Sequence, residues 1–309
     1  MGRARTQAYI GPPDADVKCG MPQKDPPEAG LSPSAALVRR HDRDRFVLAL
    51  MAPAARREAL FALFALAVEL RRIPGLVSEP VLGVMRLQYW RDLIAAEDSQ
   101  AAARGNPVAE ALAREALPRL GPDGPALLET VLQGHADDLA PDPPVDATAA
   151  RALAAATDGA LAEAAALALG AETPASREAA RHAGTAWGLA MLARNTPQAI
   201  RSGRLRLPTD AVMASGQDGA GILAGRDTDR VGIRAGVRAL LDTAEAERAT
   251  AGQAARHAER SARPVLRLSI LAAQTCRVLR RADADPYDGR VALLRPPMLA
   301  LLTAPLRGR

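Results

Sequence analysis

Four arginines lie close together in the sequence, at Arg194, Arg201, Arg204 and Arg206, with no acidic residue between the first and the last. A guanidinium group carries a permanent charge and a planar fork of N–H donors, so such a cluster can hold a phosphate or carboxylate group without a metal ion. The alternative is a solvated basic loop, which is the simpler interpretation of exposed charge.

The other residue types that often do chemistry form no recognised pattern. The histidines are too dispersed to share a metal ion or to activate a nucleophile; they are His41, His135, His182 and His257. Cys19 and Cys276 match neither a metal-binding spacing nor a disulfide framework, which favours a reducing compartment.

Asp137, Asp138 and Asp142 form a local group of carboxylates that could bind a divalent cation. Pro141 interrupts the helical pattern before the third of them, so Asp142 would not share a helix face with the other two. We therefore interpret this group as the end of a helix that enters a proline-rich loop, and metal binding is the alternative.

The composition favours a helical protein that does not bind nucleic acid. Ala, Leu and Arg recur throughout, aromatic residues are only 3%, and hydrophobic residues are 48% of the 309 residues, enough for a sizeable core. The net charge of +5 comes from arginines scattered among acids, because Lys18 and Lys24 are the only lysines. A nucleic-acid interface would concentrate its basic residues on one face.

Proline, glycine and apolar spacing divide the chain into a tail and one domain. Residues 1–33 are rich in Gly, Pro and charge without periodicity, which predicts a disordered tail, and residues 34–309 then form a single helical domain. No segment has the pattern of a strand, so the fold class is all-α. The spacing predicts helices over residues 54–73, 78–93, 126–139, 147–169, 174–195, 229–260 and 264–281. Gly184 and Gly188, one turn apart, should allow two helices to approach closely.

Several segments in this order resemble the squalene/phytoene synthase family. They are FALFALAVELRR at 61–72, SEP at 78–80, GVMRLQYWRD at 83–92, GRLRLP at 203–208 and DPYDGR at 285–290. The resemblance covers roughly residues 42–300 and implies an isoprenoid-synthase-like helical bundle around a central pocket. Enzymes of this family join two prenyl diphosphates, with Mg²⁺ held by two aspartate-rich motifs that face each other across that pocket.

The sequence departs from the family pattern at both of these motifs. The first should fall around Arg71, Arg72 and Gly75, and the second over residues 195–199, which read NTPQA. No aspartate lies between residues 44 and 92 or between 158 and 210. Neutral amides cannot hold a Mg²⁺ cluster without carboxylates. We therefore expect no catalytic residue, no metal ligand and no cofactor, and Mg²⁺ only if the chain is an enzyme after all.

The chain looks most like the aspartate-poor branch of this superfamily, which is related to the mitochondrial complex I assembly factor. That resemblance rests on Glu69, on residues 86–92 and on Arg194 followed by Pro197. It implies a non-catalytic factor in the assembly of respiratory NADH dehydrogenase. The alternatives are a prenyltransferase that condenses two prenyl diphosphates head to head and a metal-independent prenyl-lipid binding protein. Candidate pocket or anion-binding residues are Glu69, Arg71, Arg86, Arg194, Asn195, Gln198 and Arg204.

The expected location and partners follow from this resemblance and from the pattern of apolar residues. The longest apolar run, residues 59–68, is about half of a membrane-spanning helix. The first residues also lack the apolar segment of a secretory signal. We expect a cytoplasmic protein in peripheral contact with the inner membrane, on the matrix side if the cell has mitochondria. Its partners would be complex I subunits or a prenyl lipid in the pocket.

Overall fold

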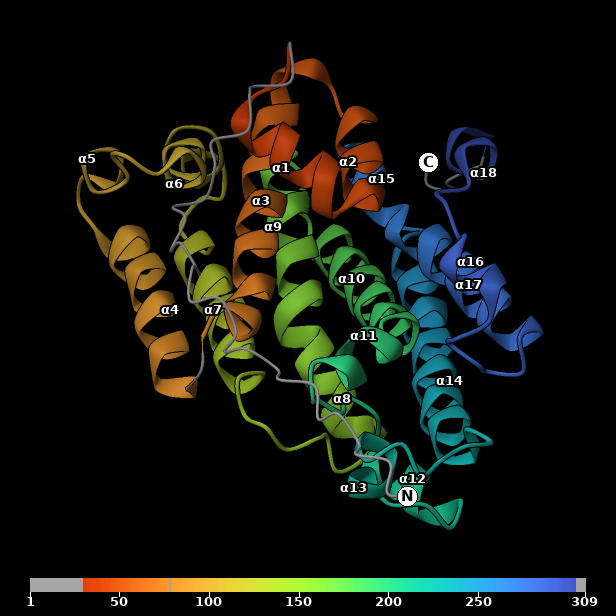
Figure 1. Ribbon diagram of the computed structural model, residues 1–309. Coiled ribbons are helices and arrows are strands. Elements are labelled where there is room, and N and C mark those ends of the chain that lie inside the picture. The colour runs from red at the N-terminus through yellow and green to blue at the C-terminus, as the bar shows by residue number, and fades with distance from the viewer. Residues whose placement is uncertain (1–29, 78, 304–309) are drawn as a thin grey trace, which may run out of the picture.

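The computed structural model describes residues 30–77 and 79–303, and within those ranges every regular element is a helix (Figure 1). The α-helices of the first half are α1 (Pro33–His41), α2 (Arg43–Leu50), α3 (Ala54–Leu76), α4 (Pro80–Ala95), α5 (Ser99–Ala102), α6 (Pro107–Ala111), α7 (Gly124–Asp137), α8 (Ala147–Ala154) and α9 (Ala160–Ala168). Those of the second half are α10 (Pro174–Arg194), α11 (Thr196–Arg201), α12 (Thr209–Ala214), α13 (Gly219–Leu223), α14 (Val231–Ala254), α15 (Arg263–Leu266), α16 (Leu268–Arg281), α17 (Gly289–Ala292) and α18 (Met298–Thr303). Short π or 3-10 segments are η1 (Leu112–Ala116), η2 (Leu117–Arg119), η3 (Ala155–Gly159) and η4 (Arg260–Ala262).

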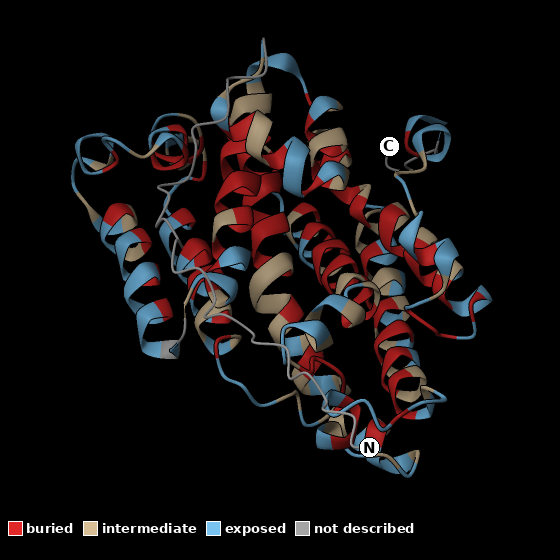
Figure 2. Ribbon diagram, viewed as in Figure 1, coloured by how far each residue is buried: buried red, intermediate tan, exposed pale blue. Residues whose placement is uncertain are grey.

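The core lies along α3, α9 and α10, which run side by side through the middle of the molecule (Figures 1 and 2). Residues 59–68 of α3 and every residue of α9 are buried, as expected of helices that are apolar around most of their circumference. A second apolar cluster joins α10 to α14 and α16. The all-α prediction is therefore confirmed.

Glycines let α10 approach the segment that precedes α9. A Cβ atom at Gly184 would overlap the backbone oxygen of Asp158, and one at Gly188 would lie 2.7 Å from a carboxylate oxygen of the same aspartate. The close helix approach predicted from these two glycines is confirmed. Its consequence is that Asp158 is pressed against α10.

The helices predicted over residues 147–169 are separated by a π-helical turn. This turn, η3, carries Asp158 and separates α8 from α9. Within it, the hydroxyl of Thr157 donates a hydrogen bond to the carbonyl oxygen of Leu153, four residues earlier. Such side-chain bonds compete with the helical pattern, and single π turns are frequent at functional sites.

Other helix boundaries differ from the sequence prediction by a few residues. Pro74 does not stop α3, which continues to Leu76, because only its last turn has to accommodate the proline ring. The helix predicted to end at residue 260 ends at Ala254. Ser78, at the start of the helix predicted over residues 78–93, lies outside the described residues.

The predicted tail, residues 1–33, lies outside the described residues as far as residue 29. At its end Leu31 packs against the core, and the Ser32 side chain accepts a hydrogen bond from the Ala35 N–H at the start of α1. The folded domain thus includes these two residues.

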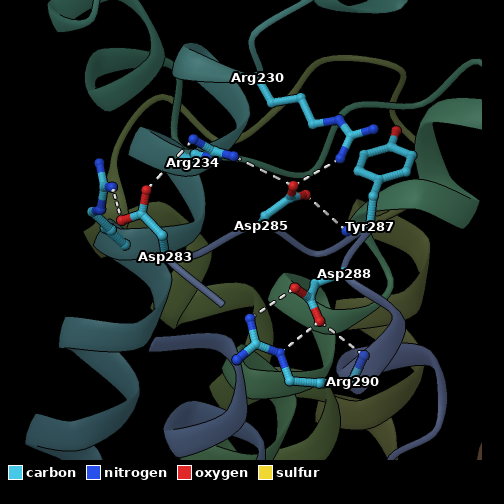
Figure 3. Close-up of polar contacts among 8 residues, drawn as sticks. Arg230, Arg234, Asp283, Asp285, Tyr287, Asp288 and Arg290 are labelled. Atoms are coloured by element: carbon cyan, nitrogen blue, oxygen red, sulfur yellow. Dashed lines mark hydrogen bonds and ion pairs between the residues drawn. The ribbon is translucent and has the colours of Figure 1, made fainter. Parts of the chain in front are cut away.

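A polar cluster ties the loop between α16 and α17 to the start of α14 (Figure 3). The Asp285 carboxylate accepts hydrogen bonds from Arg230 at 2.7 Å and from the Tyr287 N–H at 2.9 Å, and the Arg230 guanidinium lies 4.4 Å from the centre of the Tyr287 ring. Arg230 itself has a left-handed backbone, with φ of 58°. The cluster positions the segment that follows, including Leu294.

No helix within residues 30–77 and 79–303 has the length and hydropathy that crossing a bilayer requires.

Candidate functional site

A cavity of about 570 Å³ opens between the corner of α1 and α2, the end of α3, η3, α10, α11 and residues 294–296. Its wall combines apolar side chains of α10 with charged groups from the other elements. Three aspartates and five arginines line it: Asp42, Asp44, Asp158, Arg43, Arg71, Arg194, Arg206 and Arg295. This excess of basic residues makes the cavity suited to an anion.

Asp42 occupies the corner where α1 ends and α2 begins. One of its carboxylate oxygens accepts a hydrogen bond from the Arg45 N–H, 3.1 Å away, which is the usual role of an aspartate at a helix start. The other oxygen faces the guanidinium groups of Arg45, at 3.2 Å, and Arg71, at 2.6 Å. Local helix capping therefore fixes the carboxylate that the arginines bind.

Asp158 completes what we call the Arg45 network, made of Asp42, Arg45, Arg71 and Asp158. Arg45 is fully buried and donates a short hydrogen bond to Asp158, and Arg71 lies 3.8 Å from the same carboxylate. The Arg45 guanidinium also stacks on Phe64, 5.6 Å from the ring centre. The network joins α2, α3 and η3 at the cavity wall.

Two groups of the Arg45 network, Asp42 and Arg45, are held in their charged forms. Burial raises the pKa of Asp42, but Arg71 and Arg45 outweigh it and keep that pKa below its usual value. Burial lowers the pKa of Arg45, yet Asp158 and Asp42 raise it above normal. Two carboxylates thus face two guanidinium groups, and their formal charges balance.

Asp44 lies next to this network, and its ion-pair partner is Arg194. Burial, together with the charge of Asp42, raises the pKa of Asp44 to about 6. Arg194 opposes that shift from 3.7 Å, and it also donates a hydrogen bond to the carbonyl oxygen of Leu294 at 3.1 Å. Arg194 therefore connects the start of α2 to the C-terminal segment across the cavity.

The carboxylates of the cavity do not fit the Mg²⁺ cluster that the family resemblance implies. Asp42 and Asp158 have guanidinium partners where a cation would need open carboxylate oxygens. At the expected positions of the two aspartate-rich motifs the cavity presents Arg71 on one side and Asn195 with Gln198 on the other. No group of three His, Cys, Asp or Glu side chains in the described part of the chain is placed to hold a metal ion.

The structure brings together four of the seven candidate residues from the sequence. Arg71, Arg194, Asn195 and Gln198 all line the cavity. Glu69 and Arg86 instead line a separate hollow of about 210 Å³ between α3 and α4.

Arg204, the seventh candidate, packs against the loop that follows α7. It contacts the carbonyl oxygen of Asp138 and lies 3.4 Å from the carboxylate of that residue. Arg206 binds the same carboxylate at 2.7 Å and donates to the carbonyl oxygen of Ala140 at 3.0 Å. These two arginines of the predicted basic cluster therefore anchor a loop, and Arg206 also lines the cavity, as Arg194 does.

The same contacts explain Asp138, the central member of the aspartate group noted in the sequence. Burial raises its pKa to about 6, with Arg204 opposing the shift. Its carboxylate is engaged by arginine, in agreement with our interpretation of the group as a helix end.

Sequence reasoning missed Asp42, Arg45 and Asp158. A signal was present for Asp158, because it and Glu163 are the only charged residues in the alanine-rich stretch 152–171. A charge in an apolar helix needs a buried partner. The partner, Arg45, lies 113 residues away in the sequence, and no local pattern connects the two.

Trp187 is buried on the cavity wall, and its indole N–H has no hydrogen-bond partner among the described residues. It belongs to the core and also faces the cavity. A buried donor without a partner is costly, so an acceptor atom in the cavity would be stabilised there.

The histidines do not assemble into a site. His41 lines the cavity, and burial together with Arg72 lowers its pKa. His135 is held neutral because burial lowers its pKa to about 4. His182 bonds to Glu247 at 2.7 Å between α10 and α14.

Solved structures share this arrangement of helices and identify the class of protein. The chain is similar to a dehydrosqualene synthase crystallised with a ligand, with a TM-score of 0.68 and 15% identity over 87% of this chain and 92% of that one. It is also similar to squalene synthase HpnC from Alicyclobacillus acidocaldarius, with a TM-score of 0.67 and 15% identity over 82% of this chain and 94% of that one. The fold is therefore the isoprenoid synthase fold.

The sequence places the chain within that class. Residues 38–297 match the squalene/phytoene synthase family, and the chain belongs to this family. Two curated relatives are named NADH dehydrogenase (ubiquinone) complex I, assembly factor 6. The human protein is 38% identical and the bovine protein 40% identical over 58 residues. That match spans 19% of this chain and 17% of the length of either relative.

Proposed function

We propose that this chain is a non-catalytic member of the squalene/phytoene synthase family that acts in the assembly of respiratory NADH dehydrogenase. The observation that carries the first half of the proposal is the Arg45 network. Its two carboxylates, Asp42 and Asp158, are each bound to guanidinium groups at the wall of the cavity.

The chemistry of a prenyl synthase requires carboxylates that are open to metal ions. A diphosphate leaving group develops several negative charges, and metal ions held by carboxylates must neutralise them in the transition state. In this chain, freeing Asp42 and Asp158 for that task would leave the buried charge of Arg45 unpaired, and freeing either one would remove one of its two carboxylate partners; both changes are unfavourable. The network therefore stabilises the fold at the place where the family's chemistry would need open ligands.

The assembly role is supported by the partial similarity to the two assembly factors and by an exposed apolar face on α4. Leu76, Val81, Val84, Met85 and Tyr89 are exposed side by side along α4 and the end of α3. A contiguous apolar patch on a protein surface is typical of a protein–protein interface. A subunit or assembly intermediate of the dehydrogenase would bury it.

The test is deletion of the gene followed by two measurements in the same cells. NADH:quinone oxidoreductase activity should fall, and squalene, hopanoid and carotenoid levels should stay unchanged. Normal oxidoreductase activity in the deletion strain would remove the assembly role. Complementation with Met85→Asp should restore less activity than wild type, and Met213→Asp, which alters an equally exposed methionine on α12, serves as the control.

The solved structures favour an alternative, a head-to-head prenyltransferase. Purified protein given farnesyl diphosphate and Mg²⁺ should release no pyrophosphate above background. Turnover that a chelator abolishes would show that the chain is an enzyme.

The unpartnered Trp187 donor and the basic lining of the cavity favour a further candidate, a metal-independent prenyl-lipid binding protein. Native mass spectrometry of the purified protein tests it, because a bound prenyl lipid would add a defined mass. The variant Trp187→Phe, which removes the donor and keeps the ring, should then bind less of that lipid.

A further inference from the structure

Large apolar side chains are exposed at the C-terminal side of the molecule. Leu293 is 78% exposed, Leu299 is 79% exposed and Leu302 is 64% exposed, and Met298 is exposed beside them. These residues lie on α18 and on the turn after α17, at one edge of the bundle (Figures 1 and 2). Exposed leucines in such density are unfavourable in water unless something covers them.

The segment is held in place by contacts with its neighbours. Leu301 of α18 is buried, and its carbonyl oxygen accepts a hydrogen bond from Arg267 at 2.8 Å. Gln274 of α16 donates to the carbonyl oxygen of Arg295 at 3.1 Å. Figure 3 shows the cluster around Asp285 that fixes the preceding loop. The exposed leucines therefore lie on a segment that hydrogen bonds attach to the rest of the fold.

An arginine of α16, Arg277, lies next to this apolar surface, and Arg281 follows it one helical turn later. Arg277 lines two adjoining hollows, of about 530 and 260 Å³, and the second extends to Pro297 and to Ala300 of α18. Arg280 and Arg281 line the first hollow.

Only some of these basic residues are compensated by an acid. Arg280 binds Asp242 at 2.7 Å, and Arg248, which lines both hollows, binds Glu245. Arg277 and Arg281 are exposed, and neither has an acidic partner among the described residues. The rim of the apolar surface thus carries positive charge that nothing in the described chain neutralises.

We propose that this C-terminal face, made of Arg277, Arg281, Leu293, Leu299 and Leu302, docks on the surface of an anionic lipid bilayer. Leucines that enter the acyl boundary while arginines contact lipid phosphates are the arrangement of interfacial membrane binding. A protein partner would need an acidic rim and an apolar centre matched to this one face, whereas an anionic bilayer presents phosphates above an acyl region over its whole surface. A nucleic acid would match the arginines too, but this face has no aromatic side chain on which bases could stack.

Docking there would place the cavity beside the bilayer. Leu294, Arg295 and Pro296 line the cavity, whereas Leu293 and Met298, immediately before and shortly after them, are exposed on the C-terminal face. The same short segment thus separates the cavity from the proposed lipid surface. The inference holds whether or not the chain acts in complex I assembly.

The experiment is flotation of the purified full chain with phosphatidylcholine vesicles that contain or lack phosphatidylglycerol. Wild type should bind the anionic vesicles preferentially, and added salt should weaken that binding. The double variant Arg277→Gln/Arg281→Gln removes both charges and should weaken binding roughly 25-fold, about fivefold for each arginine. The control Arg104→Gln/Arg226→Gln changes the net charge equally at exposed residues outside the face and should bind like wild type.

A second pair of variants tests the leucines. Leu299→Ser/Leu302→Ser should lower binding about tenfold or more, because the apolar contact with the acyl region is lost. Val145→Ser/Met213→Ser, which removes comparably exposed side chains elsewhere, should not. An unchanged thermal midpoint shows that each variant is folded.

Three results would overturn the proposal. The first is equal binding of wild type to neutral and anionic vesicles, and the second is binding of either face variant as strong as that of its control. Finally, the face variants could retain vesicle binding and lose a co-purifying protein, which would assign the face to a protein partner.

Discussion

Replacing Arg45 tests most directly whether the ion pairs at the cavity wall hold the buried carboxylates in place. In the variant Arg45→Met the apolar length of the side chain is kept and its charge is removed. Asp42 would then depend on Arg71 alone, and Asp158 would be left with the same guanidinium at 3.8 Å. One half-buried arginine cannot compensate two carboxylates at the wall of the bundle.

The size of the effect follows from the burial of the network. Removing one partner of a buried ion pair costs about 3 to 5 kcal/mol, since the desolvated charge that remains is uncompensated. For a domain of this size, about 4 kcal/mol lowers the thermal midpoint by roughly 8 to 16 °C. The lost stacking on Phe64 adds about 0.5 to 1 kcal/mol.

The measurement is thermal and urea unfolding at pH 7.5, with Arg43→Met as the matched control. Arg43 is exposed two residues earlier on α2, and its replacement should change the free energy of unfolding by less than about 1 kcal/mol. The double variant Arg45→Met/Asp158→Asn should be more stable than Arg45→Met, because it restores one carboxylate to one guanidinium.

The pH dependence gives an independent check. In the wild type the pKa of Asp42 is lowered, so its contribution to stability is present above its unfolded pKa and is lost as the pH falls through the folded pKa. In Arg45→Met that pKa should rise, and the deficit relative to wild type should shrink as the pH is lowered toward 5. If Arg45→Met is as stable as Arg43→Met, or the double variant is less stable than Arg45→Met, the reasoning is refuted.

Two further predictions concern the neighbours of the network. Because the pKa of Asp44 is raised to about 6, the native state binds a proton more tightly than the unfolded state, and stability falls as the pH rises from about 4 to 6. Asp44→Asn should therefore raise the free energy of unfolding at pH 7.5, by up to about 3 kcal/mol, and leave it nearly unchanged at pH 4; equal effects at both pH values would contradict this. Gly184→Ala should destabilise the chain by about 2 kcal/mol or more, because its Cβ would overlap the backbone of Asp158. The control Gly252→Ala, with open space around it, should be neutral or stabilising. Chemical unfolding of both variants checks this.

The fold was largely predictable from the sequence because the signals that specify helices are local. Alanine and leucine content, prolines at helix starts and apolar spacing predict the main helices, and the predicted boundaries of α10 are within one residue of the observed ones. The π turn η3 was not predictable, because it depends on how α8 and α9 pack against α10.

The candidate site was predictable in part. Four residues were placed on the cavity because the resemblance to the squalene/phytoene synthase family aligns the segments that face it. Glu69 and Arg86 belong to the same segments, but they line the separate hollow between α3 and α4. A shift of two residues moves a side chain about 200° around a helix, which separates Glu69 from Arg71.

The sequence by itself determined the helical class, the close approach at Gly184 and the absence of aspartates from both expected motifs, since each depends on residue type and short spacing. Only the tertiary structure decided which arginines compensate which acids. Arg45 and Asp158 are brought together by the packing of α2, η3 and α10, and Arg204 is drawn to Asp138 in the same way. Ion pairs between elements far apart in the chain form where burial removes the competition of water, and burial is a property of the packed bundle.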